Sequence, residues 1–227
     1  MKKNAFFYIF VFCCFRFCQD TLPAGPAAAA KDPSEFLKAD SMEFRMKENR
    51  TIYRKNVRAV VGKNLLTADY AVDDKNLRTV EMSGNINGYY IDENTGTLKI
   101  KADNGKYDAL KEESQLWGNC WMVYTSSDGR SMEITADRIS LDGKTKIADI
   151  TGNVNLAYEN NTARTQFAKY YHQDRKVVMM KENNFMPVVN YSNGYKADFT
   201  AEKITLMPEE KKLYFESSVF SKIAKNR

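Results

Sequence analysis

The sequence predicts an all-β fold of about a dozen antiparallel strands with almost no helix. Three observations support this prediction. A unit of about 33 residues recurs from residue 37 to the C-terminus, apolar residues alternate with period two inside each unit, and turn-forming residues separate the alternating segments. Repeats of this length indicate an array in which each unit buries its apolar face against its neighbours. Such an array forms either a sandwich or a partly open barrel.

Two markers define the unit. The first is a small residue followed by an acidic residue or a relative, at Ala39-Asp40, Ala68-Asp69, Ala102-Asp103, Ala136-Asp137, Ala168-Lys169 and Ala201-Glu202. The second is a Gly-Asn-apolar step or a degraded version, at Lys55-Asn56-Val57, Gly84-Asn85-Ile86, Gly118-Asn119-Cys120, Gly152-Asn153-Val154, Asn183-Asn184-Phe185 and Ser217-Ser218-Val219. Successive units start 29, 34, 34, 32 and 33 residues apart. The fifth unit departs from the pattern, because Lys169 replaces the acidic residue and Asn183 replaces the glycine.

The markers coincide with interruptions of the strand pattern. Val154, Leu156 and Tyr158 alternate with polar or small residues, which is typical of a strand with one buried face. Glycine inside such a strand indicates a bulge or a corner. The apolar positions also change parity at several Ala-Asp markers, so we expect the repeated aspartates to form corners rather than a calcium array.

The first thirty residues are expected to be a signal peptide. Lys2 and Lys3 precede an apolar stretch, and Ala27 to Ala30 offer small residues for cleavage. Retention of this leader as a membrane anchor is the alternative. Residues 31–227 are expected to form one domain. Without the leader, 31 basic and 28 acidic residues remain, and this net charge of +3 does not indicate nucleic-acid binding.

The inventory of catalytic residues is poor. His172 is the single histidine of the sequence, and no serine has the context of a nucleophile. Cys120 is the one cysteine outside the leader and is expected to be a buried hydrophobe. A zinc site needs three or four ligands. The sequence therefore predicts no enzyme, no metal site and no cofactor.

At these repeats the chain resembles the LptA/OstA-like family of periplasmic lipopolysaccharide-transport proteins. The resemblance is carried by Ala39-Asp40 to Asn56-Val57, by Leu66-Thr67-Ala68-Asp69-Tyr70 to Gly84-Asn85-Ile86, and by Ile134-Thr135-Ala136-Asp137 to Gly152-Asn153-Val154. It implies an open, twisted β-jellyroll of about six two-strand repeats. It also implies a bridge that carries lipopolysaccharide between the inner and outer membranes.

Carried over position by position, the resemblance gives an apolar lining for the lipid A acyl chains. This lining comprises Tyr53, Val57, Met82, Ile86, Leu116, Cys120, Ile150 and Val154. The implied partners are lipopolysaccharide and other jellyroll proteins of the export system, stacked through edge strands at both ends, including further copies of the chain. The alternatives are a membrane-anchored, LptC-type member of the same system and a purely structural β-repeat of the envelope.

Overall fold

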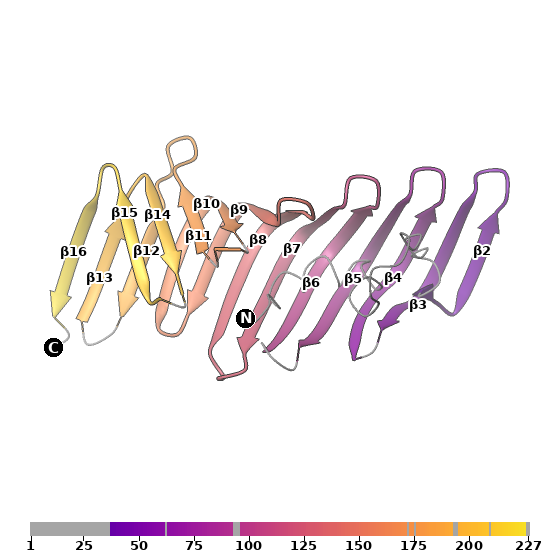
Figure 1. The fold of residues 1–227 in the computed structure, drawn as a ribbon, viewed down its shortest axis with the longest axis horizontal. Helices are drawn as coiled ribbons and strands as arrows, with labels where there is room; N and C mark the ends of the chain where they lie inside the picture. Colours follow the sequence, from indigo (N-terminus) through magenta and orange to yellow (C-terminus); the bar gives the residue numbers. More distant parts are fainter. Residues whose placement is uncertain are drawn as a thin grey trace, which may run out of the picture.

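The computed structural model describes residues 37–61, 63–92, 96–171, 173–174, 176–192, 195–208 and 210–225. These residues form sixteen strands and no helix, arranged side by side along the molecule (Figure 1). The first eight are β1 (Leu37–Lys38), β2 (Ser41–Arg45), β3 (Arg50–Val61), β4 (Asn64–Asp74), β5 (Thr79–Asp92), β6 (Gly96–Asp108), β7 (Glu113–Ser126) and β8 (Ser131–Asp142). The others are β9 (Ile147–Tyr158), β10 (Asn161–Tyr171), β11 (Lys176–Met180), β12 (Val188–Ser192), β13 (Tyr195–Thr200), β14 (Lys203–Met207), β15 (Lys212–Glu216) and β16 (Phe220–Lys225). The all-β prediction is confirmed.

Several expectations concern residues outside this description. The leader at 1–30 and His172 both lie outside the described residues. Within the described part of the chain, no helix is long and apolar enough to cross a membrane.

All sixteen strands belong to one open antiparallel sheet, which branches at β10. β10 pairs with β9 along its length on one side. On its other side, residues 167–171 pair with β11 and residues 162–164 pair with β12. The sheet then continues as two separate branches, β11-β14-β15 and β12-β13-β16. Among the described residues β1, β2, β15 and β16 each pair with one strand, so the sheet does not close into a barrel.

A line of bulges divides the sheet into two arms. Arm A consists of β2, the half-strands 50–54, 70–74, 79–83, 104–108, 113–117, 138–142, 147–151 and 167–171, and β11, β14 and β15. Arm B consists of β1, the half-strands 57–61, 64–68, 86–92, 96–102, 120–126, 131–136, 154–158 and 161–165, and β12, β13 and β16. The branches beyond β10 are therefore the continuations of the two arms.

The bulges are built by the Gly-Asn markers. Gly118 has φ 76° and Asn119 has φ 47°, and the equivalent residues of β5 and β9 have nearly the same angles. Glycine takes such angles without the penalty that a Cβ atom brings. A Cβ on Gly118 would also lie 2.6 Å from the Oδ2 atom of Asp103 on the neighbouring strand. Both the backbone angle and the close approach of the aspartate therefore require glycine here.

The repeated aspartates are structural, as expected. The side-chain Nδ2 of Asn56, Asn85, Asn119 and Asn153 donates to the Oδ2 of Asp40, Asp69, Asp103 and Asp137, respectively, at 2.7 to 2.9 Å. Each of these hydrogen bonds joins the two markers of one unit across a pair of strands. The bonds form a ladder along the bulges, which explains why the two markers are separated by a constant interval.

The fifth unit has a different register from the one expected. On β10 the register shift lies between Thr165 and Phe167, opposite Gly152 and Asn153. Gln166 therefore takes the place that aspartate has in other units, and its Oε1 accepts a hydrogen bond from the backbone N–H of Asn153 at 3.3 Å. Ala168-Lys169 lies three residues further along and is not the marker. The sixth unit keeps the pattern, because Ser217 and Ser218 have φ 61° and 50°.

The two arms share one hydrophobic core. Buried side chains of both arms belong to a single contact cluster that runs from Leu37 to Ile204. A Cβ on Gly105 of arm A would lie 3.3 Å from the Cδ1 of Ile86 in arm B. Near the C-terminal end, Phe199 of arm B stacks on Phe215 of arm A, with ring centroids 4.8 Å apart. The arms therefore face each other, folded along the line of bulges.

Candidate functional site

The eight residues expected to line the interior lie in two rows of the shared core. Tyr53, Met82, Leu116 and Ile150 belong to arm A, and Val57, Ile86, Cys120 and Val154 belong to arm B. All eight are buried, with exposed fractions from 0 to 6 %. The structure thus brings together the whole set, although the sequence placed the residues tens of positions apart.

The arm B row alternates large and small side chains, and the arm A row does so from Tyr53 to Leu116. In arm B the alanines of the first marker stand between the larger residues, in the order Val57, Ala68, Ile86, Ala102, Cys120, Ala136 and Val154. In arm A, Ala71 and Gly105 stand beside Tyr53, Met82 and Leu116 in the same way. Large and small residues in neighbouring positions let two facing layers interdigitate. The marker alanine therefore serves the packing of the interior.

A row of tyrosines borders the interior on arm B, and the sequence analysis missed it. Tyr90, Tyr124, Tyr158 and Tyr191 occupy the same lateral position on alternate strands of arm B. The guanidinium of Arg130 donates to the Tyr158 hydroxyl at 3.1 Å. Tyrosine joins an apolar ring to a polar tip, so it suits the boundary between an apolar interior and water. Their recurrence every 33 or 34 residues was the signal available in the sequence.

Cys120 has the properties of a packing residue. Burial raises the pKa of its thiol to about 11, and its Sγ lies 3.6 Å from the backbone oxygen of Asp137. A thiol with a raised pKa is a poor nucleophile at neutral pH. No group of three or more metal-ligating side chains occurs among the described residues.

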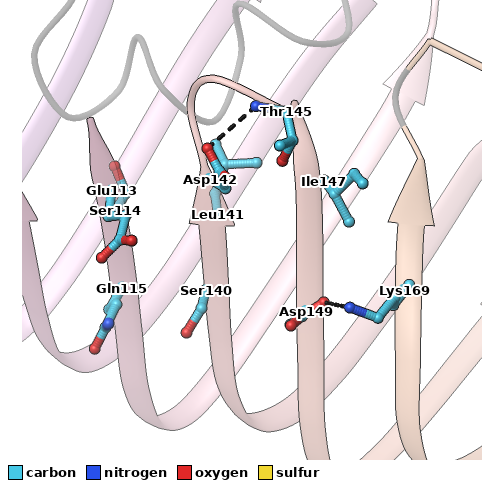
Figure 2. A pocket seen from close by; sticks show the side chains of 10 residues that line it. All are labelled: Glu113, Ser114, Gln115, Ser140, Leu141, Asp142, Thr145, Ile147, Asp149 and Lys169. Atoms are coloured by element: carbon cyan, nitrogen blue, oxygen red, sulfur yellow. Dashed lines mark hydrogen bonds and ion pairs between the residues drawn. The ribbon is translucent and has the colours of Figure 1, made fainter. Parts of the chain in front are cut away.

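Two surface hollows lie away from the eight interior residues. Figure 2 shows the smaller, with a volume of about 270 Å³, between β7 and β10. Gln115, Ser140, Asp149 and Lys169 stand side by side in it, and Lys169 Nζ lies 2.8 Å from Asp149 Oδ1. These residues alternate with Leu116, Ile139 and Ile150, so they belong to the opposite face of arm A. In Figure 2 the strand that carries Gln115 bends sharply beyond this residue, toward the line of bulges.

The interior is exposed at both ends of the sheet. At the β2 end, Met42 pairs with Tyr53 and is 66 % exposed, while Phe44 pairs with Thr51 and is 53 % exposed. At the other end, Ile223 of β16 pairs with Ala197 and is 63 % exposed. Both rows of the core thus continue into uncovered apolar side chains on edge strands, whose N–H and C=O groups can accept a further strand.

This combination defines a class of protein. A continuous apolar interior between two arms of a β-repeat sheet, with uncovered ends, is the architecture of a binding or transport protein.

The comparisons with known proteins specify this class. Residues 37–147 match the family model described as "LptA/(LptD N-terminal domain) LPS transport protein". This segment belongs to the LptA/LptD N-terminal domain family. This confirms the resemblance noted in the sequence. Because the family consists of transport proteins, the expectation that the chain is not an enzyme is also confirmed.

A solved structure similar to the chain is that of LptH from Pseudomonas aeruginosa, described as the LptA-homologous periplasmic component of the conserved lipopolysaccharide transport device. The similarity covers 65 % of this chain and 82 % of that chain, at 16 % identity and a TM-score of 0.31. Among curated protein sequences, none matches the chain significantly.

Proposed function

We propose that the chain is a periplasmic bridge that carries lipopolysaccharide, with the acyl chains sheltered between arm A and arm B. The observation that carries this proposal is the single apolar core that spans both arms and ends in uncovered apolar residues at both edges. Each methylene group removed from water contributes about 0.8 kcal/mol, so a few methylene groups of one acyl chain already offset a substantial binding cost.

The packed interior sets a condition on this function. Val57, Ile86 and Val154 are at most 2 % exposed, so an acyl chain can reach them only if the arms part. The arms are joined along the bulges, and among the described residues no strand pairing links the free end of arm A to that of arm B. Opening would therefore break van der Waals contacts while the ladder along the bulges stays intact.

Site-specific photo-crosslinking tests the path. A photoreactive amino acid at Ile86 or Val154 should form adducts with lipopolysaccharide, whereas one at Asn155 should form few. Asn155 is a matched control because it follows Val154 on the same strand and is exposed. Equal labelling at Asn155, or no adduct at either interior position, would refute the path and favour a purely structural β-repeat.

The same proposal includes end-to-end stacking of copies. Arm A and arm B each contain twelve strands from one edge to the other, so a translated copy would present β2 antiparallel to β15 and β1 antiparallel to β16. Continuing the lateral rows across the junction would place Phe215 beside Met42 and Leu213 beside Phe44. Both pairs would extend the buried rows without a break.

Disulfide formation tests this register. Copies with Leu213→Cys mixed with copies with Phe44→Cys should form a covalent dimer on mild oxidation, because paired residues lie within disulfide reach. The control pairs Leu213→Cys with Glu43→Cys, whose side chain points to the opposite face. Equal yields from both mixtures would refute the register. The alternative of an anchored, LptC-type member is separated by the mass of the mature N-terminus, which the signal-peptide expectation places after Ala30.

A further inference from the structure

Three consecutive turns at the free end of arm A expose a large apolar side chain that is followed directly by a cation. The turns are 46–49, 75–78 and 109–112, and they succeed one another along one edge of the sheet (Figure 1). Met46 is 80 % exposed, Leu77 is 56 % exposed and Leu110 is 60 % exposed. We call these three residues, with Lys47, Arg78 and Lys111 after them, the tip row.

The turns hold the tip row in a fixed arrangement. The Oδ1 of Asp74 accepts a hydrogen bond from the backbone N–H of Leu77 at 2.9 Å. The Oδ1 of Asp108 accepts from the N–H groups of Leu110 and Lys111, both at 3.0 Å. Hydrogen bonds within the turns thus hold Leu77 and Leu110 in their exposed positions.

Neighbouring turns are also bonded to each other. Lys75 N donates to Asn49 O at 3.1 Å, and the side chains of Asn49 and Asn76 are hydrogen-bonded at 3.0 Å. Ala109 N donates to Arg78 O at 2.9 Å, which joins the second turn to the third. Because two strands separate one tip from the next, the tips are spaced by about 10 Å. The result is a preorganised line of about 20 Å.

The free end of arm B does not share this chemistry. Its described turn residues are Lys63, Ser127-Asp128-Gly129-Arg130 and Glu159-Asn160; none of them is a large apolar residue, and Arg130 is ion-paired with Asp128. On arm A, Lys111 lies 3.7 Å from Asp108, and no ion pair within 4 Å is recorded for Lys47 or Arg78 among the described residues. The next turn of arm A adds Lys144 and Lys146. These four turns of arm A carry six cations against Glu48 and Glu112, whereas the described turns of arm B carry Lys63 and Arg130 against Asp128 and Glu159, so the edge of arm A is both more cationic and more apolar.

We propose that the tip row docks on the surface of an anionic lipid bilayer. Apolar side chains that enter the region between headgroups and acyl chains bind through buried area, and adjacent cations bind the lipid phosphates. The tips are single apolar residues separated by about 10 Å, each followed directly by a cation in the sequence. A fluid lipid surface accommodates such spacing, whereas a protein partner would need a separate pocket for each tip.

Vesicle binding by the full chain tests the charge requirement. Vesicles of phosphatidylcholine with about 30 % phosphatidylglycerol, free of lipopolysaccharide, should bind the protein, and pure phosphatidylcholine should bind it much less. The triple variant Lys47→Glu, Arg78→Glu, Lys111→Glu should bind on the order of 100-fold more weakly. All variants share the same N-terminus, so any contribution of residues 1–36 cancels in the comparison.

The matched control reverses three exposed cations on the outer face of arm B, in Arg58→Glu, Lys101→Glu, Arg164→Glu. It changes the net charge equally but leaves the tip row intact, so binding should change by no more than a few-fold. An equal loss in both triple variants, or no preference for anionic vesicles, would overturn the proposal. Since lipopolysaccharide is absent, neither outcome depends on the proposed transport function.

A depth measurement tests the apolar contact. Leu77→Trp should be quenched by lipids with brominated acyl chains beyond the background of Trp117 and Trp121 in the wild type. Ser127→Trp, at the tip of a turn of arm B, should show no added quenching. Quenching that is equal at the two positions, or absent at Leu77, would overturn the assignment. Binding of the tip row to an acidic protein surface, without binding to the vesicles, would identify a protein partner and would also overturn the assignment.

Discussion

Replacing Gly118 by alanine tests the explanation of the bulges. Gly118 has φ 76°, and a Cβ there would lie 2.6 Å from Asp103 Oδ2 and 2.9 Å from Asp103 Cβ. Gly129 offers a matched control, because its φ is 84° but a Cβ would meet nothing within 4 Å. Gly129→Ala therefore reports the backbone strain alone, and Gly118→Ala reports the strain together with the clash.

The expected magnitudes follow from these two terms. A non-glycine residue in the left-handed region costs about 1–2 kcal/mol, which is the expected loss for Gly129→Ala. Overpacking in a tight site costs a further ~1–3 kcal/mol. Gly118→Ala should therefore destabilise by about 2–5 kcal/mol. For a chain of this size, each kcal/mol lowers Tm by about 2–4 °C.

Urea unfolding followed by circular dichroism measures both variants. In the first unit, Lys55 has φ 63° at the position that Gly118 occupies in the third unit. A side chain can therefore occupy this position on β3, which is flanked by the edge strands. Gly118 lies on β7, with a long strand on each side, so we expect less relaxation there. The reasoning is wrong if Gly118→Ala is no less stable than Gly129→Ala, because the neighbouring aspartate would then move at no cost.

Three further predictions concern single residues. The thiol of Cys120, whose pKa is raised to about 11 by burial, should resist alkylation at pH 8 in the folded protein and react after unfolding, as followed by peptide mass. Asp74 has a pKa below its usual value of 3.8, chiefly because the backbone N–H of Leu77 donates to it. The ionised carboxylate of Asp74 therefore stabilises the fold above pH 3.8. The loss of unfolding free energy that Asp74→Asn causes at pH 7 should disappear in acid unfolding curves as the pH falls through the lowered pKa. Asn153→Ala removes the 2.9 Å hydrogen bond to Asp137 and should cost about 1–3 kcal/mol in urea unfolding, including the strain of alanine at φ 46°. An unchanged midpoint would show that the ladder contributes nothing.

Sequence reasoning predicted the local features of this fold well. Period two placed Val57, Ile86 and Val154 on the buried face, and the structure confirms their burial. The glycine of the second marker was expected at a bulge, and Gly84, Gly118 and Gly152 are found there. These features depend on neighbouring residues and backbone angles, which a single sequence encodes directly.

The features that were missed depend on contacts between distant residues. The fifth marker was placed at Ala168-Lys169, but the structural equivalent is Thr165-Gln166. Gln166 accepts a hydrogen bond from the backbone N–H of Asn153, whereas the marker aspartates accept from asparagine side chains, so the position keeps an acceptor but changes its partner. The branching at β10 was also unpredictable, because it is decided by which later strand pairs with each half of β10.

The role of the candidate lining remains a prediction that the crosslinking experiment decides. The sequence indicated which residues point inward, since parity is a local property. Whether arm A and arm B separate depends on the free energy of packing between them, and no pattern along the chain reports that free energy.

The pairing of strands has a consequence for chain length. One unit of about 34 residues adds an outgoing and a returning strand, so it restores the original strand direction. A duplicated or deleted unit between β4 and β9 would leave β1, β2, β15 and β16 with the same orientation and the same free edges. Homologues of this protein can therefore grow or shrink in steps of two strands, roughly 10 Å each, and still join the same neighbours.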